Sequence, residues 1–231
     1  MIIKIQFIWR FLDGLMLLAI NPKMMVKILD KDIQKLLKKL NASHEPILLN
    51  VESETDSQIM DCLNNVKRKI ERDSGKMILG WQIWKTNLLV EAEFHAVWED
   101  KNLNLHDITP KGISIEKILF VEDEKLTYDG TQKDSIRINT TNNELVDDLI
   151  KVCEAIYRFD NRGERAFLYD LSSVLNENQL KHKVNLIELR EIVRCILNLN
   201  GNQNSICPCQ SQKPFIDCHG KNLELIILKD I

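Results

Sequence analysis

Residues 91–110 have the sequence EAEFHAVWEDKNLNLHDITP, and they decide the fold because two segments of strand character follow one another across a short turn. In the first segment Glu91, Glu93 and His95 alternate with apolar residues, so one face of a strand carries two carboxylates and an imidazole. The residues after the turn predict a short antiparallel strand that brings Asp107 beside His95. A histidine and a carboxylate on neighbouring strands predict a functional site.

The segments on either side of this stretch extend it into an α+β fold. Residues 77–84 predict a partner strand joined to the histidine strand by a hairpin, and residues 113–121 predict a further strand. Before the sheet, residues 30–40 have the periodicity of an amphipathic helix capped by Asp30, and residues 59–70 predict a second helix. We therefore expect helix followed by antiparallel sheet.

From Asn143 onward the periodicity is helical. Apolar stripes over residues 145–156, 166–175 and 186–199 predict a helical C-terminal half. Residues 200–204 are polar and predict a linker. The expected organisation has four parts: an apolar N-terminal extension over residues 1–25, an α+β core over residues 26–142, a helical region over residues 143–200 and a small zinc module over residues 205–221.

Composition excludes several classes of protein. The chain has 231 residues, 44% hydrophobic and 28% charged, as a globular protein does, and its net charge of -3 gives no reason to expect nucleic acid. Arg10 and Asp13 interrupt the apolar start, which disfavours a membrane span. That start is interpreted as an extension upstream of a natural start at Met24 or Met25, or as a helix docked on the core.

The cysteines indicate a metal site. Three of the six lie within twelve residues, which suits metal ligation and predicts a reducing, cytoplasmic location. Cys207, Cys209, Cys218 and His219 supply three thiolates and an imidazole, enough to close a tetrahedral shell around Zn²⁺. A closed shell has no open position, so the expected zinc is structural.

Residues 206–220 resemble the SEC-C motif, named for the C-terminus of the preprotein translocase ATPase. The resemblance rests on the CPC opening, the eight-residue spacer, Phe215 and the closing Cys-His-Gly, whereas Gln210, Ser211 and Gln212 replace the usual Gly-Ser-Gly. In the translocase the motif contacts a chaperone and the ribosome. The resemblance therefore implies a docking or stabilising module with protein or ribosome partners.

The upstream helix adds a thiol to the histidine and carboxylate. Nucleophilic thiol chemistry requires a base for the thiol proton and a third group that orients the base. The order of Cys62 on a helix, then His95 and Asp107 on successive strands, resembles the papain and transglutaminase-like superfamily. That resemblance implies Cys62 as nucleophile, His95 as general base and acid, and Asp107 as orienting group.

An oxyanion in such a site would be stabilised by the Cys62 backbone N–H and by a side-chain donor, for which Gln58 and Asn64 are the candidates. The non-catalytic interpretation is that Cys62 is a core cysteine and that His95 is hydrogen-bonded by a neighbouring carboxylate. A metal site formed by Glu91, Glu93 and His95 is less favoured, since alternate residues of one strand rarely close a coordination shell.

Two functions follow from these patterns. One is a cysteine-dependent amide hydrolase or acyl transferase that acts on a protein or peptide substrate. The other is a non-catalytic zinc-binding adaptor that docks protein or ribosome partners.

Overall fold

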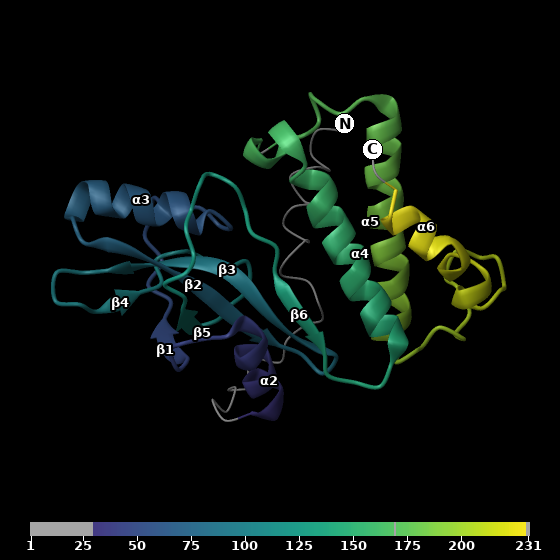
Figure 1. Cartoon of the computed structure of the whole chain (residues 1–231), viewed down its shortest axis with the longest axis horizontal. Coiled ribbons are helices and arrows are strands. Elements are labelled where there is room, and N and C mark those ends of the chain that lie inside the picture. Colours follow the sequence, from purple (N-terminus) through teal and green to yellow (C-terminus); the bar gives the residue numbers. More distant parts are fainter. Residues whose placement is uncertain (1–29, 169, 230–231) are drawn as a thin grey trace. The chain divides into compact units, whose positions relative to one another are not determined.

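The computed structural model describes residues 30–168 and 170–229, so the predicted extension over residues 1–25 lies outside the described residues. The chain divides into two compact units, which are described separately (Figure 1). The sheet unit holds the residues up to Thr86 together with Val90–Tyr128 and Ser135–Ile138, and the helical unit holds Asn87–Leu89, Asp129–Asp134 and the residues from Asn139 onward.

The sheet unit combines helices with an antiparallel sheet, as the sequence predicts. Its elements are α2 (Lys31–Leu40), β1 (Ile47–Asn50), α3 (Cys62–Asp73), β2 (Lys76–Lys85), β3 (Leu89–Glu99), β4 (Leu105–His106), β5 (Lys117–Glu122) and β6 (Ile136–Asn139). Asp30 caps α2, because its carboxylate accepts the backbone N–H of Asp32 at 2.9 Å. The short strand β6 is absent from the sequence-based prediction.

The sheet curls into a near-barrel. Its strand order is β1-β5-β2-β3-β4, with β6 paired to β3. The pairings between β1 and β5, β2 and β5, β2 and β3, and β3 and β4 are antiparallel. A parallel bridge joins Val51 to Asp107, and the Glu52 N–H donates to the Asp107 carbonyl at 2.7 Å. The end of β1 thus meets the segment after β4, and the sheet closes.

Alternation along β2 and β3 separates an outer from an inner face. On the outer face, α2 packs on Trp81 and Phe94, and α3 packs on Ala96. On the inner face, Val97 packs with Phe120. Because neighbouring residues of a strand point to opposite faces, His95 shares the inner face with Val97.

One glycine is required by the packing of these strands. Gly80 of β2 lies opposite His95 of β3 in the antiparallel register. A Cβ at this position would lie 2.2 Å from the Val121 carbonyl oxygen and 2.5 Å from Phe120 Cζ. The close approach of β2 to β5 therefore depends on the missing side chain.

The helical unit is built on an antiparallel pair of helices. Its elements are α4 (Glu144–Asp160), η1 (Gly163–Phe167), α5 (Glu177–Asn198), η2 (Phe215–Asp217), η3 (Gly220–Asn222) and α6 (Leu223–Ile227). Asn143, before α4, donates to the carbonyl of Gly201, after α5, at 2.8 Å. At the opposite ends, Lys183 lies 2.8 Å from Asp160, which fixes the antiparallel arrangement.

The helix predicted over residues 166–175 is wrong. Among the described residues of this range, only Ala166 and Phe167 are helical, as the end of the short 3₁₀ segment η1, and the others are irregular. Asp170 accepts the backbone N–H of Ser172 at 2.8 Å, a local side-chain bond that competes with helical hydrogen bonding.

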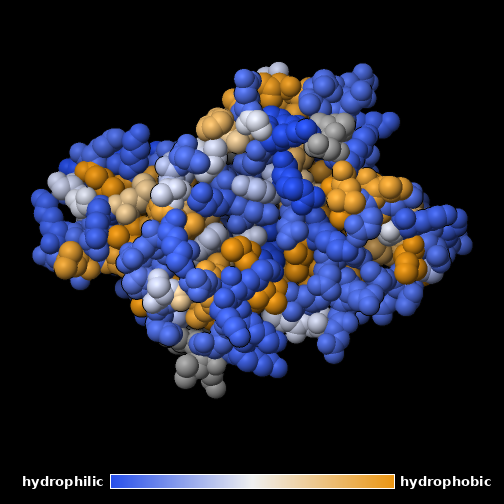
Figure 2. Space-filling model, in the orientation of Figure 1, coloured by the Kyte–Doolittle hydropathy of each residue, from blue (hydrophilic) through white to orange (hydrophobic). Residues whose placement is uncertain are grey.

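No helix within the described residues has the length and apolar character needed to cross a bilayer. The face drawn in Figure 2 is largely hydrophilic and carries apolar patches between polar regions.

Candidate metal centre and buried polar cluster

A cysteine and histidine cluster lies near the end of the described chain. The two segments that carry it are held together by an isolated bridge between Ile206 and Pro214 and by the Cys207 N–H, which donates to the Lys213 carbonyl at 2.8 Å. Phe215 is 1% exposed and forms the core of this turn. Gly220 packs so closely that a Cβ would lie 2.8 Å from the Phe215 ring.

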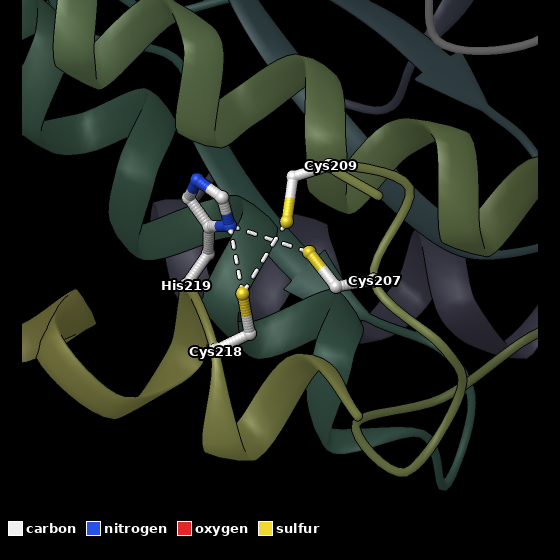
Figure 3. Close-up of side chains that lie close together, drawn as sticks. All are labelled: Cys207, Cys209, Cys218 and His219. Carbon is white, nitrogen blue, oxygen red and sulfur yellow. Dashed lines mark hydrogen bonds between the residues drawn. The ribbon is translucent and has the colours of Figure 1, made fainter. Parts of the chain in front are cut away.

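The four side chains converge on one point (Figure 3). Cys207 Sγ lies 3.3 Å from His219 Nδ1, Cys209 Sγ lies 3.4 Å from Cys218 Sγ, and Cys218 Sγ lies 3.4 Å from His219 Nδ1. All four atoms lie within 4.8 Å of one another, so the cluster can hold a metal ion. A tetrahedral zinc ion, with bonds of about 2.3 Å to sulfur and 2.0 Å to nitrogen, places its ligand atoms roughly 3.5–3.8 Å apart.

The environments of two of the thiols differ. The Ser211 side chain and backbone lower the pKa of Cys209 to about 6, whereas burial raises the pKa of Cys207 to about 11. Thiolates are the species that bind a metal cation. Cys209 is therefore the more readily ionised ligand before a cation binds.

The turn after Cys209 has an unusual backbone. Gln210 and Gln212 have φ angles of 68° and 59°, in the left-handed region that glycine adopts without strain. These are the two positions at which the resembled motif has glycine. The turn therefore keeps its left-handed conformation although neither position is glycine.

The metal cluster is part of the helical unit. Leu223 and Ile227 of α6 are buried, and α6 contacts both α4 and α5. Lys151 of α4 lies 2.6 Å from Glu224, and Arg158 donates to the Ile227 carbonyl at 3.1 Å.

The predicted linker over residues 200–204 is hydrogen-bonded. The Asn202 N–H donates to Ser205 Oγ at 3.0 Å, and Gln203 donates to Asp148 at 2.7 Å. The segment therefore ties the metal cluster to α4.

A second cluster of polar side chains lies on the inner face of the sheet. His95 Nε2 lies 3.1 Å from Asp107 Oδ1, and these residues are 4% and 0% exposed. The structure thus brings together two of the three residues that the sequence proposes as catalytic. The Thr109 N–H also donates to Asp107 Oδ1, at 3.2 Å.

Two residues that the sequence reasoning missed complete this cluster. Lys111 Nζ lies 2.6 Å from Asp107 Oδ2, 3.0 Å from Gln82 Oε1 and 3.4 Å from His95 Nε2. Gln82 is 2% exposed, and its Nε2 has no hydrogen-bond partner among the described residues. The four-residue spacing of Asp107 and Lys111 gave no signal for the lysine, because the two residues lie in an irregular segment and not on a helix.

Burial and charge set the protonation of the cluster. The pKa of His95 is lowered below its ordinary value of 6.5, mainly by burial and next by the Lys111 ammonium. The Asp107 carboxylate acts in the opposite direction and raises this pKa. Burial opposes ionisation of Asp107, yet His95 and Lys111 together hold the pKa of that carboxyl below its usual range. For Glu93, burial and then the Glu91 carboxylate raise the pKa. The favoured state is a neutral imidazole beside an ionised aspartate.

Cys62, the third predicted catalytic residue, begins α3 and packs in the outer cluster with Val66 and Ala96. Burial raises the pKa of its thiol to about 12, although the Ala96 N–H opposes the shift. Lys111 and Asp107 also influence this pKa, so the thiol lies within electrostatic range of the polar cluster. The nucleophilic role of Cys62 stays a prediction.

The two predicted oxyanion donors lie on the surface. Gln58 is exposed, and its backbone N–H donates to Asn65 Oδ1 at 2.9 Å. Asn64 is exposed, and its side-chain amide donates to Asp61 at 2.6 Å. In this arrangement the Asn64 amide holds the start of α3.

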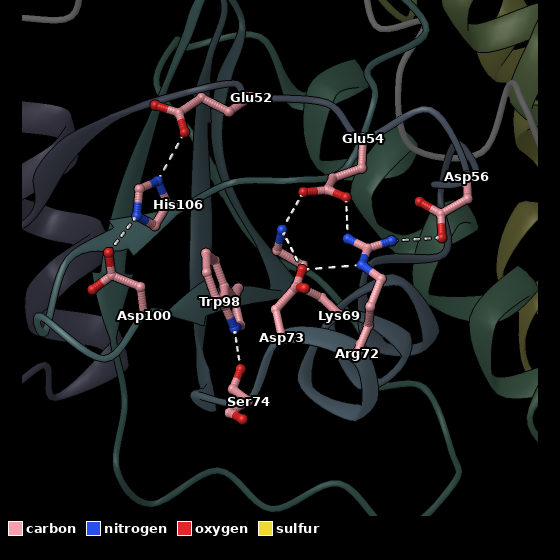
Figure 4. Close-up of polar contacts among 10 residues, drawn as sticks. All are labelled: Glu52, Glu54, Asp56, Lys69, Arg72, Asp73, Ser74, Trp98, Asp100 and His106. Atoms are coloured by element: carbon pink, nitrogen blue, oxygen red, sulfur yellow. Dashed lines mark hydrogen bonds and ion pairs between the residues drawn. The ribbon is translucent and has the colours of Figure 1, made fainter.

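Ion pairs hold the segment before α3 against that helix (Figure 4). Lys69 and Arg72 of α3 both pair with Glu54, and Arg72 also lies 3.2 Å from Asp56. Lys69 further pairs with Asp73 at 2.8 Å. This network positions the segment that leads to Cys62.

Next to the ion pairs, His106 lies between two carboxylates (Figure 4). Its Nδ1 is 2.8 Å from Glu52, and its Nε2 is 3.4 Å from Asp100. The Trp98 ring lies beside the His106 ring, tilted by 37°, with the two ring centroids 5.3 Å apart. The Trp98 Nε1–H donates to the Ser74 carbonyl at 2.9 Å. These contacts tie β3 and β4 to the end of α3.

The chain matches no family model, no curated protein and no solved structure.

Proposed function

We propose that this chain is a zinc-binding protein whose Cys207, Cys209, Cys218 and His219 hold a structural zinc ion in a SEC-C-type module. The observation that carries the proposal is the convergence of three sulfur atoms and one imidazole nitrogen within 4.8 Å. Four such ligands fill a tetrahedral shell and leave no position for a substrate, so the ion stabilises the module and does not react.

The module's role in this proposal is to dock a protein partner. Two apolar side chains of α6 and its C-terminal end, which follow the metal cluster in the chain, support it, since Leu225 is 74% and Leu228 is 71% exposed. Exposed apolar surface favours protein contacts where it is contiguous. This is the adaptor function, with protein or ribosome partners and a cytoplasmic setting.

Metal content tests the zinc assignment. The purified full chain is expected to contain one equivalent of zinc, and the Cys207→Ser/Cys209→Ser variant is expected to contain almost none. The matched control is Cys153→Ser/Cys195→Ser, which removes two thiols from α4 and α5 and should keep the metal. Full zinc content in the first variant refutes the assignment.

The second candidate function is a cysteine-dependent amide hydrolase or acyl transferase of the papain and transglutaminase-like kind. The buried pair of His95 and Asp107, 3.1 Å apart, favours it. Nε2 of His95 faces the aspartate, so in this candidate function the proton of Cys62 goes to Nδ1. The transfer requires the Cys62 thiol to reach the inner face of the sheet, since it packs on the outer face beside Ala96. Burial keeps the resting thiol protonated, so activity requires this transfer.

Thiol reactivity tests the second candidate. Cys195 and the metal ligand Cys209 are exposed, so in the zinc-loaded protein an ordinary alkylating reagent reaches Cys195 before Cys62 when Cys62 is not activated. An activated Cys62 would be labelled faster than Cys195 at neutral pH, and His95→Gln would abolish that advantage. Slower labelling of Cys62 than of Cys195, unchanged by His95→Gln, contradicts the enzymatic function.

A further inference from the structure

The strongest unassigned feature is Lys111, which the proposed chemistry does not yet use. Its side chain is 6% exposed, and its ammonium contacts three groups of the inner face. The closest contact is with Asp107 Oδ2 at 2.6 Å, followed by Gln82 Oε1 at 3.0 Å and His95 Nε2 at 3.4 Å. A buried ammonium with this set of neighbours restricts how each of them can hydrogen-bond.

The His95 Nε2 atom can play only one role at a time. If it carries the proton, it donates to Asp107 Oδ1 at 3.1 Å and cannot accept from Lys111. If it is unprotonated, it accepts from Lys111 at 3.4 Å, and its lone pair then faces the carboxylate oxygen without a proton between them. The shorter contact and the repulsion in the second state both favour the proton on Nε2.

Lys111 supports the first state through Asp107. Its ammonium forms an ion pair with Oδ2, while the Thr109 N–H donates to Oδ1, so two groups other than His95 hold the carboxylate. Gln82 holds the ammonium from the other side. These contacts keep the carboxylate ionised and oriented toward the imidazole.

We propose that Lys111 is a positioning residue that, by fixing the Asp107 carboxylate, sets His95 in the neutral tautomer with its proton on Nε2 and its lone pair on Nδ1. The functional meaning rests on the second candidate function, since a lone pair on Nδ1 is what a base for Cys62 needs. Besides Asp107 and Lys111, the charged and ionisable groups near this cluster are Glu93 and Glu91 on β3, Arg137 on β6, which pairs with Glu91, and Cys62 on α3.

Histidine NMR on the ¹⁵N-labelled full chain tests this directly. Long-range ¹H–¹⁵N correlations, with the His95 signals assigned by comparison with His95→Gln, are expected to show the Nε2–H tautomer at pH 7.5. A proton on Nδ1 in the wild-type protein overturns the proposal, and this result needs no lysine variant.

Lys111→Met removes the ammonium, and Lys111→Arg keeps the charge as a matched control. In Lys111→Met the Asp107 charge acts on His95 alone, so the titration midpoint of His95 is expected to move upward. In Lys111→Arg it is expected to stay near the wild-type value. An unchanged midpoint and tautomer in a folded Lys111→Met variant overturn the proposal.

These readouts do not involve Cys62. The Nε2–H tautomer and its dependence on Lys111, seen together with an unreactive Cys62, would refute the cysteine chemistry and support the positioning role. A reactive Cys62, seen together with a His95 tautomer and titration midpoint that do not change in Lys111→Met, would support the cysteine chemistry and refute the positioning role.

Discussion

Asp107 lies 3.1 Å from His95 Nε2 through Oδ1 and 2.6 Å from the Lys111 ammonium through Oδ2. One fully buried carboxylate thus contacts an imidazole with one oxygen and an ammonium with the other. The stability and the pH response of the sheet unit depend on this sharing.

Asp107→Asn is expected to destabilise the protein strongly. The variant leaves the Lys111 ammonium buried without its charge partner, and breaking a buried pair costs about 3–5 kcal/mol. Urea unfolding followed by tryptophan fluorescence measures the loss, because Trp81 and Phe94 pack together in this unit. Glu116→Gln, a change at an exposed carboxylate, is the control and should stay within about 0.5 kcal/mol of wild type.

The stability of the sheet unit is expected to fall as the pH drops below 6.5. The folded pKa of His95 is lowered, so the unfolded chain binds more protons between that pKa and the ordinary value of 6.5. The contribution of His95 to stability therefore rises with pH through this window and levels off above it. The raised pKa of Glu93 acts in the opposite sense above its ordinary value of 4.5. The lowered pKa of Asp107 adds a second loss at more acidic pH, below the ordinary value of 3.8.

Urea midpoints measured from about pH 2 to pH 8 reveal these windows. His95→Gln should flatten the window just below pH 6.5 and leave the more acidic one. An identical pH profile in wild type and variant would contradict the assignment of the upper window to His95.

Gln210→Gly and Gln212→Gly are each expected to stabilise the metal module. Both positions have left-handed φ angles, which cost a residue with a Cβ about 1–2 kcal/mol, and glycine removes this strain. Glycine also gives the unfolded chain more conformational entropy, which offsets part of the stabilisation. The net effect is roughly 0.5–1 kcal/mol per site. Lys213→Gly, in the same turn but outside the left-handed region, should destabilise instead.

Chelation of the metal is expected to destabilise the helical unit as well as the turn. Leu223 and Ile227 are buried, and α6 packs against both α4 and α5. Thermal unfolding by circular dichroism should show a lower midpoint with excess chelator, reversed by one equivalent of zinc. The Cys207→Ser/Cys209→Ser variant should show the low midpoint with or without chelator.

The features that the sequence predicts correctly are those that depend on the spacing of residues close together in the chain. Alternation over residues 77–98 predicts the β2 and β3 hairpin, Asp30 predicts the start of α2, and the metal cluster follows from the positions of three cysteines and one histidine. Each depends on residues close together in the chain.

The features that were missed depend on distant contacts. The strand β6 has four residues, and its place is set by Arg137, which pairs with Glu91 at 2.9 Å. Gln82 and Lys111 meet only because the sheet brings β2 beside the segment after β4. The error over residues 166–175 has a local cause, because periodicity does not reveal the competing bond between Asp170 and Ser172.

The bridge between Val51 and Asp107 has a kinetic consequence. The backbone of Asp107 closes the sheet, while its side chain holds His95, so the burial of the polar pair is complete only when the sheet has closed. Contacts between residues far apart in sequence form slowly during folding. A chain whose sheet is still open would leave His95 closer to water and to its ordinary titration, which makes this histidine a spectroscopic reporter of sheet closure.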